Sequence, residues 1–381
     1  MAAAKTVYHY LLAWLGDLIY RRPSRKIFVL GVTGTKGKTT VLELIAFILE
    51  RAGKKTAVSS SLRYLHSAMT MPGRFFLQRF LRQAVKNSCD YALIEVTSEG
   101  VRQHRHRFIN WDGAMFLNLA PEHIEAHGSF EKYRKAKLDF FRHHSGKIKT
   151  FFINKDDSNA RYFIDAARDG QVVLYGKSDL PSQLPGEFNQ YNISAAAAFA
   201  RSQGIDEEVI KKAVAEFPGV PGRMEFIQRQ PFAVVIDYAH TPDSLREVYR
   251  TLRSKSANPE SAMRDPKLIC VLGAAGGGRD KWKRPEMGKI ASQYCDAVVL
   301  TNEDSYDETP EEIIFQIENG LANHKNYFKI IDRREAIKKA IGLARPGDMV
   351  VVTGKGNESW IHLKKGKKIP WSDRGVVLEL L

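Results

Sequence analysis

The sequence predicts an α/β protein with a P-loop-type central domain on a parallel sheet, followed by a C-terminal Rossmann-like α/β domain. Short β-branched apolar runs alternate with amphipathic helical patterns, and many of these runs end in glycine-rich or polar turns. The alternation starts again after a Pro- and Gly-rich stretch at 217–226. We therefore expect a helical segment over 1–26, a central domain over 27–222 and a C-terminal domain over 223–381.

The first strand–turn–helix unit carries the features of a phosphate-binding loop. An apolar run from Ile27 is followed by Gly34-Thr35-Lys36-Gly37-Lys38-Thr39-Thr40 and then by a helix with one apolar stripe. Glycines let backbone N–H groups face an anion, and a helix N-terminus favours negative charge. We expect Lys38 to reach a terminal phosphate and the Thr39 hydroxyl to ligate Mg²⁺. The general P-loop pattern has glycine where Val32 stands, so this prediction depends on the strand–helix context.

Further strands and helices follow in alternation. In the central domain the strands are expected at 91–96, 113–118, 150–154 and 171–176, with helices around 129–142 and 191–202. The C-terminal strands are expected in FAVVIDYAH, KLICVLGAAGGG, CDAVVLTNED, YFKIIDR and GDMVVVTGKG. Because α/β sheets bind ligands at the carboxyl ends of their strands, we expect sites at these turns and a cleft between the domains.

The charge balance is strongly basic. The 381 residues include 58 Lys and Arg against 43 Asp and Glu, a net charge of +15, with clusters at 102–107 (RQHRHR) and 364–368 (KKGKK). The sequence has no zinc-finger spacing, no RNP-type aromatic motif and no long basic tail. We therefore expect a basic surface that attracts anionic substrates, and no nucleic-acid partner.

Cysteine use and hydropathy indicate a cytoplasmic protein. Cys89, Cys270 and Cys295 are scattered and form no CxxC pair, so we expect no disulfide framework and a reducing compartment. The sequence has no signal peptide with a small-residue cleavage site and no run of 18 apolar residues.

The N-terminal segment predicts an amphipathic helix. Its apolar face would carry Val7, Tyr10, Leu11, Trp14, Leu15 and Leu18. The helix is too short, and too interrupted by His9 and Asp17, to span a bilayer. We expect this face to dock on the protein's own core; contact with a partner or with a membrane surface is the alternative.

Three polar residues outside the glycine-rich turn are candidates for chemistry. Glu95 closes a predicted strand and could hold Mg²⁺, or it could be an ion-pair partner. His123 follows another strand, in NLAPEHIEAHG, and could be a ligand, although a lone histidine is more often structural. Lys137 by itself resembles an ordinary lysine on a helix surface.

Ten motifs, taken in order, resemble the landmarks of the Mur ligases, the ATP-dependent amide ligases of cell-wall peptide assembly. The resemblance covers about residues 27–375 and is strongest to the UDP-N-acetylmuramoyl-tripeptide synthetase branch, which adds the third residue of the stem peptide. The motifs are GVTGTKGKTT, EVTSEG, NLAPEHIEAHG, YRKAK, GEFNQYN, VPGRME, VIDYAHTPDSL, GAAGGGRDKWKRP, DRREAI and GKGNE.

The resemblance implies ATP and Mg²⁺ as cofactors. Lys38, Lys137 and His123 match catalytic positions, and Lys137 matches a lysine that reacts with CO₂ to form a carbamate, whose anionic oxygen can ligate a metal. The implied metal ligands are Thr39, Glu95, His123 and Lys137. The implied ATP-binding residues are Gly34, Thr35, Lys36, Gly37, Lys38, Thr39, Thr40, Asn192, Arg223 and Asp237.

The implied substrates are an anionic peptide or peptidyl-nucleotide and an amino acid. Positions that match contacts to the first are Thr70, Pro72, Thr97, Gln103 and Arg105. Positions that match contacts to the amino acid are Arg279, Gly354 and Glu358.

The implied reaction has two steps. A substrate carboxylate attacks the γ-phosphorus of ATP, and an amine then attacks the resulting acyl phosphate and expels phosphate. Domain closure would position the reactants. A related ligase acting on another acceptor, as in folylpolyglutamate or cyanophycin synthesis, is one alternative, and a non-catalytic nucleotide-binding scaffold is another. We expect a monomer or a dimer.

The sequence departs from the family pattern in three places. Family members carry an N-terminal domain that cradles UDP, whereas about 26 residues precede the first strand here, so we expect a UDP-linked substrate to lose those contacts. Diaminopimelate-using members have Asp-Asn-Pro-Arg where this chain has Glu303-Asp304-Ser305-Tyr306, so a distal carboxylate would lose its guanidinium partner. Asn357 replaces the histidine of GKGHE.

Overall fold

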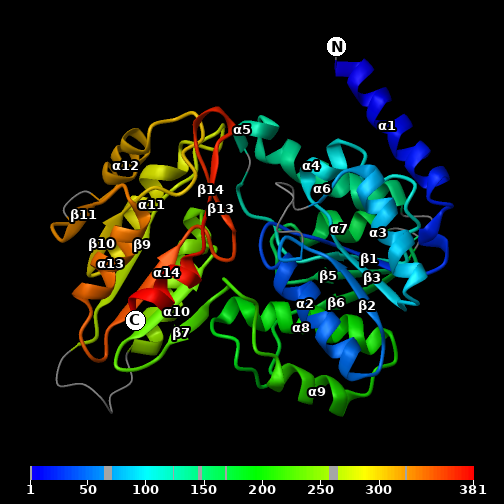
Figure 1. The fold of residues 1–381 in the computed structure, drawn as a ribbon. Helices are drawn as coiled ribbons and strands as arrows, with labels where there is room; N and C mark the ends of the chain where they lie inside the picture. Colours follow the sequence, from blue (N-terminus) through cyan, green and yellow to red (C-terminus); the bar gives the residue numbers. More distant parts are fainter. Residues whose placement is uncertain are drawn as a thin grey trace. The chain divides into compact units, whose positions relative to one another are not determined.

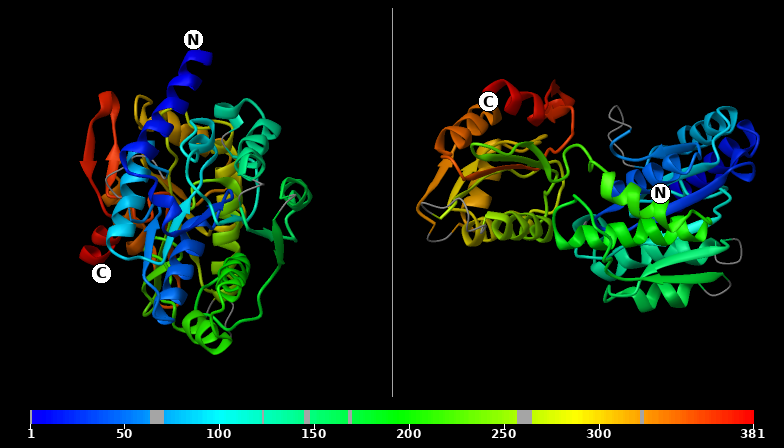
Figure 2. Two further views of the ribbon diagram at one scale, coloured as in Figure 1. Left: turned by 90° about the vertical axis from the view of Figure 1, so that its right-hand side faces the viewer. Right: turned by 90° about the horizontal axis from the view of Figure 1, so that it is seen from below.

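The computed structural model describes residues 2–63, 71–122, 124–144, 148–167, 170–256, 265–321 and 324–381. The chain forms two compact units, one of Met1–Pro121 with His127–Pro218 and the other of Glu122–Ala126 with Gly219–Leu381. Each unit is built on its own six-stranded sheet, and Figures 1 and 2 show helices on both faces of each sheet. The predicted α/β class is confirmed.

The sheet of the first unit is parallel throughout. Its strands lie in the order β2 (Thr56–Ser59), β3 (Tyr91–Glu95), β1 (Phe28–Thr33), β4 (Gly113–Phe116), β5 (Thr150–Asn154) and β6 (Gln171–Tyr175). One face is covered by α2 (Lys38–Arg51) and α8 (Glu187–Ser202), with α9 (Glu207–Glu216) against them. The other face carries α3 (Arg74–Lys86), α6 (Phe130–His144) and α7 (Ala160–Ala166), with α4 (Ser98–Arg102) against α6.

Burial on both faces explains the apolar runs of the central strands. All five residues of β3 are buried, including the terminal Glu95. Between the sheet and α3, α6 and α7 lies a core that includes Leu77, Leu81, Phe140, Phe141 and Phe163. Register places Val32, near the end of β1, beside Glu95. The carboxyl end of β3 therefore lies next to the glycine-rich turn that follows β1.

The second unit has one antiparallel edge. Its strands lie in the order β11 (Tyr327–Lys329), β10 (Ala297–Leu300), β9 (Leu268–Leu272), β12 (Met349–Thr353), β8 (Ala233–Asp237) and β7 (Glu225–Gln228), and only β7 runs antiparallel to its neighbour. Helices α10 (Pro242–Ser256), α11 (Lys283–Tyr294) and α12 (Pro310–Glu318) pack together on one side, and α13 (Arg333–Leu343) and α14 (Asp373–Leu380) on the other.

Several short elements were not predicted. The stretch 217–226 contains the start of β7, and β2 is a four-residue strand between α2 and the next helix. Strand β13 (Trp360–His362) pairs with β14 (Lys368–Pro370) as a hairpin. The remaining elements are α5 (Ile124–His127) and the 3₁₀ turns η1 (Pro23–Arg25) and η3 (Lys364–Gly366). Each of the missed strands has only three or four residues, too few for a period of two to stand out.

The expected docking of the N-terminal helix on the core was wrong. Helix α1 (Ala2–Ile19) packs against α3, but through the face that carries Ala13, Gly16 and Asp17. Most of the predicted apolar face points to solvent, although the Tyr10 ring also contacts the Phe108 ring. Its side chains are exposed by a third or more: Val7, Tyr10, Leu11, Trp14, Leu15 and Leu18. A small glycine–alanine surface allows close approach to α3, which the larger side chains would prevent.

The expected absence of a disulfide was also wrong. Cys270 and Cys295 form one, with their Cα atoms 6.1 Å apart. Cys270 lies within β9 and Cys295 directly precedes β10, and these two strands are neighbours in the sheet. Proximity therefore comes from strand order, which cysteine spacing does not reveal. The disulfide removes the argument for a reducing compartment that we drew from the cysteines.

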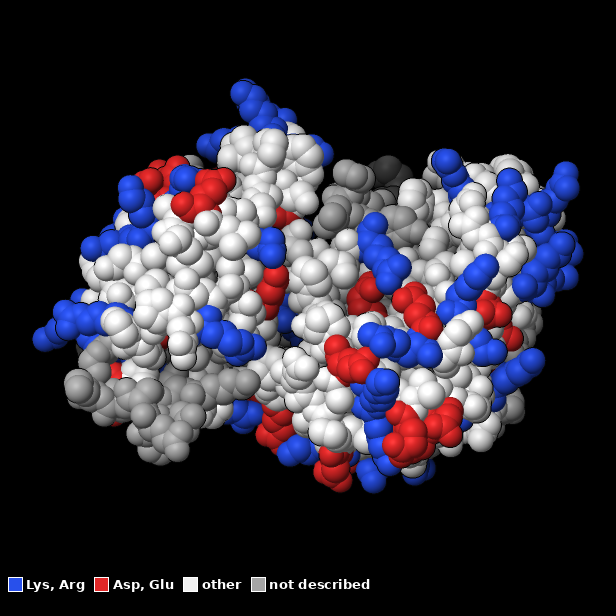
Figure 3. Space-filling view, turned by 60° about the horizontal axis from the view of Figure 1, so that its bottom comes forward, with Lys and Arg blue, Asp and Glu red and all other residues white. Residues whose placement is uncertain are grey.

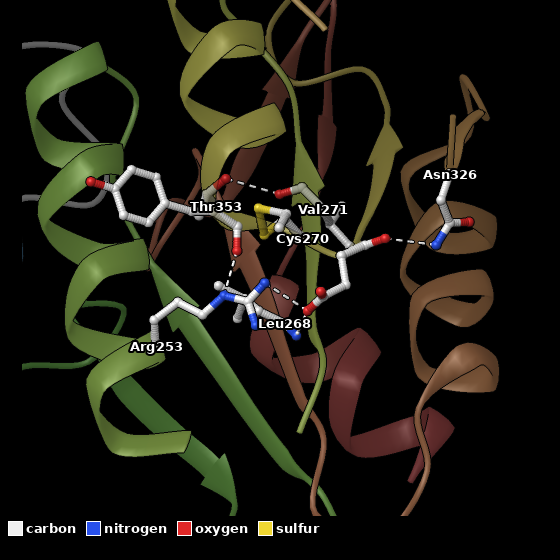
Figure 4. The surroundings of a disulfide bond; sticks show 9 residues. Arg253, Leu268, Cys270, Val271, Asn326 and Thr353 are labelled. Atoms are coloured by element: carbon white, nitrogen blue, oxygen red, sulfur yellow. Dashed lines mark hydrogen bonds and ion pairs between the residues drawn. A yellow bond between two sulfur atoms is a disulfide. The ribbon is translucent and has the colours of Figure 1, made fainter. Parts of the chain in front are cut away.

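Hydrogen bonds and an ion pair fix the two residues that flank Cys295, Tyr294 and Asp296 (Figure 4). The Arg253 guanidinium donates to the Tyr294 carbonyl at 2.6 Å and pairs with the Asp296 carboxylate at 2.7 Å. Asp296 also accepts from the Leu268 amide at 2.7 Å, and its carbonyl accepts from the Asn326 side chain at 2.7 Å. The residues flanking Cys295 are thus fixed to β9 and α10.

Among the described residues, no helix is long and apolar enough to cross a membrane. Figure 3 shows Lys and Arg side chains spread over the visible face, with Asp and Glu side chains among them.

Candidate active site

The glycine-rich turn connects β1 to α2 and has the backbone geometry that an anion site requires. Gly37 directly precedes α2 and has φ of 85°, a conformation that L side chains rarely adopt. A Cβ atom there would lie 2.3 Å from the Asn192 Oδ1 atom of α8. Glycine is therefore required at position 37 both by its torsion angle and by the approach of Asn192, a predicted nucleotide-site residue.

Asn118, which follows β4, fixes the turn. Its side-chain oxygen accepts from the Lys36 amide at 2.9 Å, and its amide group donates to the Lys36 carbonyl at 3.1 Å. Its backbone carbonyl accepts from the Thr35 amide at 2.9 Å. Sequence reasoning missed Asn118 as a site residue, although it stands at the end of a predicted strand, where a polar side chain is a usable signal.

Two lysines from distant parts of the chain meet at this turn. The Lys38 ammonium donates to the Gly34 and Thr35 carbonyls at 3.0 Å each. The Lys137 ammonium, on α6, donates to the same Gly34 carbonyl at 2.8 Å. Lys137 is buried and lies 4.9 Å from the Tyr133 ring centre, so it is not the surface lysine that its local sequence indicates.

The predicted metal ligands Thr39 and Glu95 are in direct contact. The Thr39 hydroxyl, in the first turn of α2, donates to the Glu95 carboxylate at 2.5 Å and lies 2.9 Å from the Ser61 hydroxyl. Both oxygens are hard donors of the type that Mg²⁺ prefers. These side chains lie at the N-terminus of α2, where a helix favours negative charge, and could hold Mg²⁺ and the phosphates of a nucleotide.

Two of the predicted site residues, His123 and Thr70, lie outside the described residues. Their neighbours can be placed. The amides of Ile124 and Glu125 donate to the Asp280 carboxylate at 3.2 and 2.9 Å, and the Glu125 side chain accepts from the Lys281 amide at 2.9 Å. These bonds group the segment Glu122–Ala126 with the second unit.

The predicted peptide-substrate residues of the first unit fall in one neighbourhood. Arg105 is buried; its guanidinium donates to the Met71 carbonyl, next to Pro72, and to the Gln103 side chain at 2.7 Å. Burial lowers the pKa of Arg105 from its usual value. Thr97 instead caps α4, since its hydroxyl accepts from the Gly100 amide at 3.1 Å.

The predicted ATP residues of the second unit have local structural partners. The Asp237 carboxylate, at the end of β8, accepts from the Ala239 amide at 2.6 Å and from the Met224 amide at 2.7 Å. The Arg223 guanidinium stacks over the Tyr238 ring at 4.1 Å. Asp237 therefore joins the turn that precedes β7 to the turn that follows β8.

A buried charge cluster forms at the carboxyl ends of β10 and β12. The Lys355 ammonium contacts the Asp304 carboxylate at 2.9 Å and the Glu358 carboxylate at 2.5 Å. The other Glu358 oxygen accepts from the Tyr238 hydroxyl at 3.0 Å. Our predictions did not include Lys355, although its position in the glycine-rich GKG turn after a buried strand was an available signal.

Glu303 completes this cluster and has an unusual charge state. Burial and the neighbouring Asp304 carboxylate raise its pKa, Lys355 partly opposes the shift, and the net result is a pKa of about 7. Gly354 has φ of 105°, and a Cβ atom there would lie 2.3 Å from the Glu303 Oε2 atom. Gly354 is therefore a contact residue of the cluster because it has no side chain.

Tyr306 stands where the diaminopimelate-binding arginine is expected from the resemblance. Its ring stacks on the His362 ring with centres 5.1 Å apart, and the Arg279 guanidinium lies 5.8 Å from its centre. The predicted amino-acid residues Arg279, Gly354 and Glu358 thus belong to one neighbourhood of the second unit, joined by Tyr306, Asp304 and Lys355.

Comparison with known families agrees with these motifs. The description "Mur ligase middle domain" matches residues 32–181, and "Mur ligase, glutamate ligase domain" matches residues 222–356. The chain belongs to the Mur ligase family. The resemblance that the motifs indicated is confirmed.

The curated relatives of this family member include UDP-N-acetylmuramoyl-L-alanyl-D-glutamate–2,6-diaminopimelate ligases. The chain is 36% identical to the one from Aquifex aeolicus, over 95% of its own length and 79% of the relative's. It is 37% identical to the one from Syntrophomonas wolfei, over 97% of its own length and 81% of the relative's. The named relatives are therefore ligases that act on a muramoyl peptide.

Solved structures of this family share the fold. A structure of a diaminopimelate ligase of the same name matches with a TM-score of 0.62 and 29% identity, covering 97% of this chain and 82% of that one. A folylpolyglutamate synthase from Mycobacterium tuberculosis, complexed with ADP and AMPPCP, matches with a TM-score of 0.70 and 16% identity, covering 93% of this chain and 96% of that one. The second likeness concerns the fold alone.

Proposed function

We propose that this Mur ligase uses ATP and Mg²⁺ to join an amino acid to a carboxylate of a muramoyl-peptide substrate. The observation that carries the proposal is the convergence of Lys38, Lys137, Thr39 and Glu95 at one glycine-rich turn. Identity of 34–37% to several muramoyl-peptide ligases supports this acceptor class over folate or cyanophycin chemistry. A nucleotide-binding scaffold would not require this set of residues.

The proposed reaction begins with the attack of a substrate carboxylate oxygen on the γ-phosphorus of ATP. The bond from the γ-phosphorus to the bridging oxygen breaks, and ADP leaves. The amine of the incoming amino acid then attacks the acyl carbon, loses a proton and expels phosphate. Lys38 and the backbone N–H groups of Gly37, Lys38 and Thr39 at the start of α2 would stabilise the negative charge on the transferred phosphoryl group. Mg²⁺, when bound at Thr39 and Glu95, would supply further charge neutralisation.

We propose that Lys137 acts as a carbamate. The ammonium would first lose a proton, and the neutral amine would then attack CO₂, forming an N–C bond and releasing a second proton. The side chain would thereby change from a cation to an anion. Two facts support this: Lys137 is buried, and its ammonium shares the Gly34 carbonyl with Lys38. A carbamate would replace repulsion between neighbouring cations by attraction and would add an oxygen ligand for Mg²⁺. His123 stays a proposed ligand of the same metal.

We propose that the two sites divide the substrates. The neighbourhood of Pro72, Gln103 and Arg105, with Thr70 and Thr97, would bind the muramoyl peptide, because a buried guanidinium suits a carboxylate. The neighbourhood of Arg279, Gly354 and Glu358 would bind the amino acid. Asn192, Arg223 and Asp237 stay proposed nucleotide contacts, and a cytoplasmic location is proposed because the named relatives use nucleotide-linked substrates.

The decisive experiment is a substrate screen with the purified full chain. The protein would be incubated with ATP, Mg²⁺, UDP-N-acetylmuramoyl-L-alanyl-D-glutamate and one amino acid at a time, with phosphate release and product mass measured. Diaminopimelate, lysine and ornithine test whether a distal carboxylate is accepted beside Tyr306. We expect substrate-dependent phosphate release with a product heavier by one amino-acid residue. No release with any muramoyl peptide, but release with a folate acceptor, would overturn the acceptor assignment.

A further inference from the structure

Helix α1 presents its large apolar side chains to solvent and a surface of mostly small residues to the protein. Val7, Leu11, Trp14 and Leu18 follow one another at steps of three and four residues and form one stripe, with Leu15 beside it. The buried face, on the opposite side, carries Ala13, Gly16 and Asp17. This orientation is the reverse of the usual one, in which an amphipathic helix covers the core with its apolar face.

The outward orientation is fixed by specific contacts. A Cβ atom on Gly16 would lie 3.6 Å from the Gln78 side chain and 3.8 Å from the backbone of Arg74 and Phe75, so α1 and α3 pack closely at this point. The Tyr10 ring meets the Phe108 ring edge-on at 5.0 Å, and the Arg107 guanidinium lies 5.5 Å from the Tyr10 ring centre. Rotating the stripe inward would break these contacts.

The exposure is large for a stripe of this composition. Leu11 is 53% exposed and Trp14 is 46% exposed, and Tyr8 and Ile19 extend the apolar surface on one side. Figures 1 and 2 show the N-terminal half of α1 projecting from the body of the first unit. The stripe is therefore a convex surface on a protruding helix, which suits insertion into a soft apolar layer.

The charges of the segment that carries the stripe are almost all positive. Residues 7–26 contain Arg21, Arg22, Arg25 and Lys26, and the acidic residue among them, Asp17, is buried and lies 3.8 Å from the Arg22 guanidinium. A second copy of this chain would bring the same positive charges to the stripe, so the complementary surface must be anionic.

We propose that α1 docks the protein on the surface of a bilayer that contains anionic phospholipids. The stripe would lie at the boundary between headgroups and acyl chains, with Trp14 and Tyr8 in the position that interfacial aromatic residues favour. The flanking lysines and arginines would contact lipid phosphates. Since no described helix can cross a membrane, the contact is peripheral. This proposal does not depend on the ligase assignment.

The test is co-sedimentation of the full chain with vesicles of phosphatidylcholine alone or with about 30% phosphatidylglycerol. We expect binding to the anionic vesicles, weakened at high salt and at least about 10-fold stronger than binding to phosphatidylcholine. A variant with Leu11→Ser, Trp14→Ser and Leu18→Ser should lose at least about 10-fold in vesicle affinity. The matched control is Phe315→Ser, which removes an apolar side chain that is 54% exposed on α12 and should bind like the unmodified chain.

Two further experiments test the contribution of the basic residues to vesicle binding and the insertion of Trp14 into the bilayer. Arg25→Ala with Lys26→Ala should weaken binding by about 5-fold for each removed charge. Brominated lipids should quench the tryptophan fluorescence of the unmodified chain more than that of the Trp14→Phe variant. This measurement tests insertion of Trp14 into the bilayer even if the triple variant fails to fold. Ligase activity of the triple variant without vesicles should be unchanged.

Any of four results would overturn the proposal. One is the absence of binding to either vesicle type, and another is equal binding by the triple variant with its native circular-dichroism melting curve. The third is a dimer, measured by light scattering, that the triple variant dissociates while vesicle binding is absent; the stripe would then be an interface between copies. Capture of an acidic protein partner through the stripe, without vesicle binding, would count against the bilayer in the same way.

Discussion

Each unit has its candidate site at the carboxyl ends of the strands of its own sheet, but the groups that form the two sites differ. In the first unit, the turn after β1 is a run of consecutive residues whose backbone groups form the cradle, with lysines added to it. In the second unit, charged side chains from the ends of β10 and β12 meet as Glu303, Asp304, Lys355 and Glu358. A backbone cradle is specified by one stretch of sequence, whereas a charge cluster is specified by strand order.

This difference predicts that substitutions in the first site should mainly reduce activity and that substitutions in the second should mainly reduce stability. Removing a side chain from the cradle leaves the backbone geometry in place, so binding chemistry should be lost while the fold persists. Removing one member of a buried charge cluster leaves the others desolvated and unbalanced, so stability should be lost first. The following substitutions test this contrast.

The largest expected effect is that of Lys38→Ala on catalysis. The ammonium that would reach the transferred phosphoryl group is removed, so kcat should fall by about 10³-fold, equivalent to about 4 kcal/mol. The melting temperature should change little. Phosphate release and thermal melting are the measurements, with Lys54→Ala, exposed beyond the end of the same helix, as control. Activity within 10-fold of the unmodified enzyme would contradict the assignment of Lys38.

The next effect is the loss of stability in Lys355→Met. The Asp304 carboxylate would keep the His362 amide as a donor at 2.8 Å but would lose its buried cation. The free energy of unfolding in urea should fall by about 3 kcal/mol. Lys364→Met, at an exposed lysine in η3, should change it by less than about 0.5 kcal/mol. Equal stabilities of the two variants would show that the cluster is not a stability determinant.

Lys137→Ala tests the carbamate. We expect activity to fall roughly 100-fold because a metal ligand is lost. Short carboxylic acids should restore part of that activity, since they can place a carboxylate in the vacated space. Lys135→Ala, exposed on the same helix, should behave as the unmodified enzyme. Loss of activity without any rescue would favour a structural role for Lys137.

Reduction of the Cys270–Cys295 disulfide should have a smaller effect. The bond links residues 25 apart in sequence, so breaking it should lower the free energy of unfolding by about 2 kcal/mol. Unfolding would be measured with and without dithiothreitol, and Cys89→Ala should show the same difference as the unmodified chain. Three reactive thiols in the denatured, unreduced protein would disprove the bond.

The last expected effect concerns pH. The folded-state pKa of Glu303 is about 7 against an ordinary value of 4.5, so the folded protein holds a proton that the unfolded chain releases between these values. Stability should therefore fall as pH rises from 4.5 to 7, by about 1 kcal/mol for each pH unit. Glu303→Gln should flatten this part of the stability profile. A slope of opposite sign there, absent from the variant, would show that Glu303 is ionised in the folded protein.

The contrast between the units also explains what sequence reasoning could predict. The α/β class, the long buried strands and the glycine-rich turn were predicted because each is encoded by a local pattern, either periodicity or a run of glycines. Lys137 was singled out only through the family resemblance, because its burial depends on how α6 packs over β1. Lys355 and Asn118 were missed because their partners lie 51 and 82 residues away in the chain.

The two wrong predictions, on the docking of α1 and on the absence of a disulfide, have the same physical origin. The stripe on α1 has the pattern of a core-facing helix, but periodicity gives the direction of an apolar face only relative to the helix itself. The contact of Gly16 with α3 decided which side turned inward. The disulfide was missed because pairing of Cys270 with Cys295 follows from the adjacency of β9 and β10.

The short segment Glu122–Ala126 interrupts the first unit in sequence yet groups with the second. Its amides are the donors to Asp280, so a fragment beginning at Gly219 would expose that carboxylate without them. A single cut after Pro218 therefore does not separate the two compact units, because Glu122–Ala126 stays on the fragment that carries the first unit. Transfer of the whole second unit to another protein would have to include both pieces.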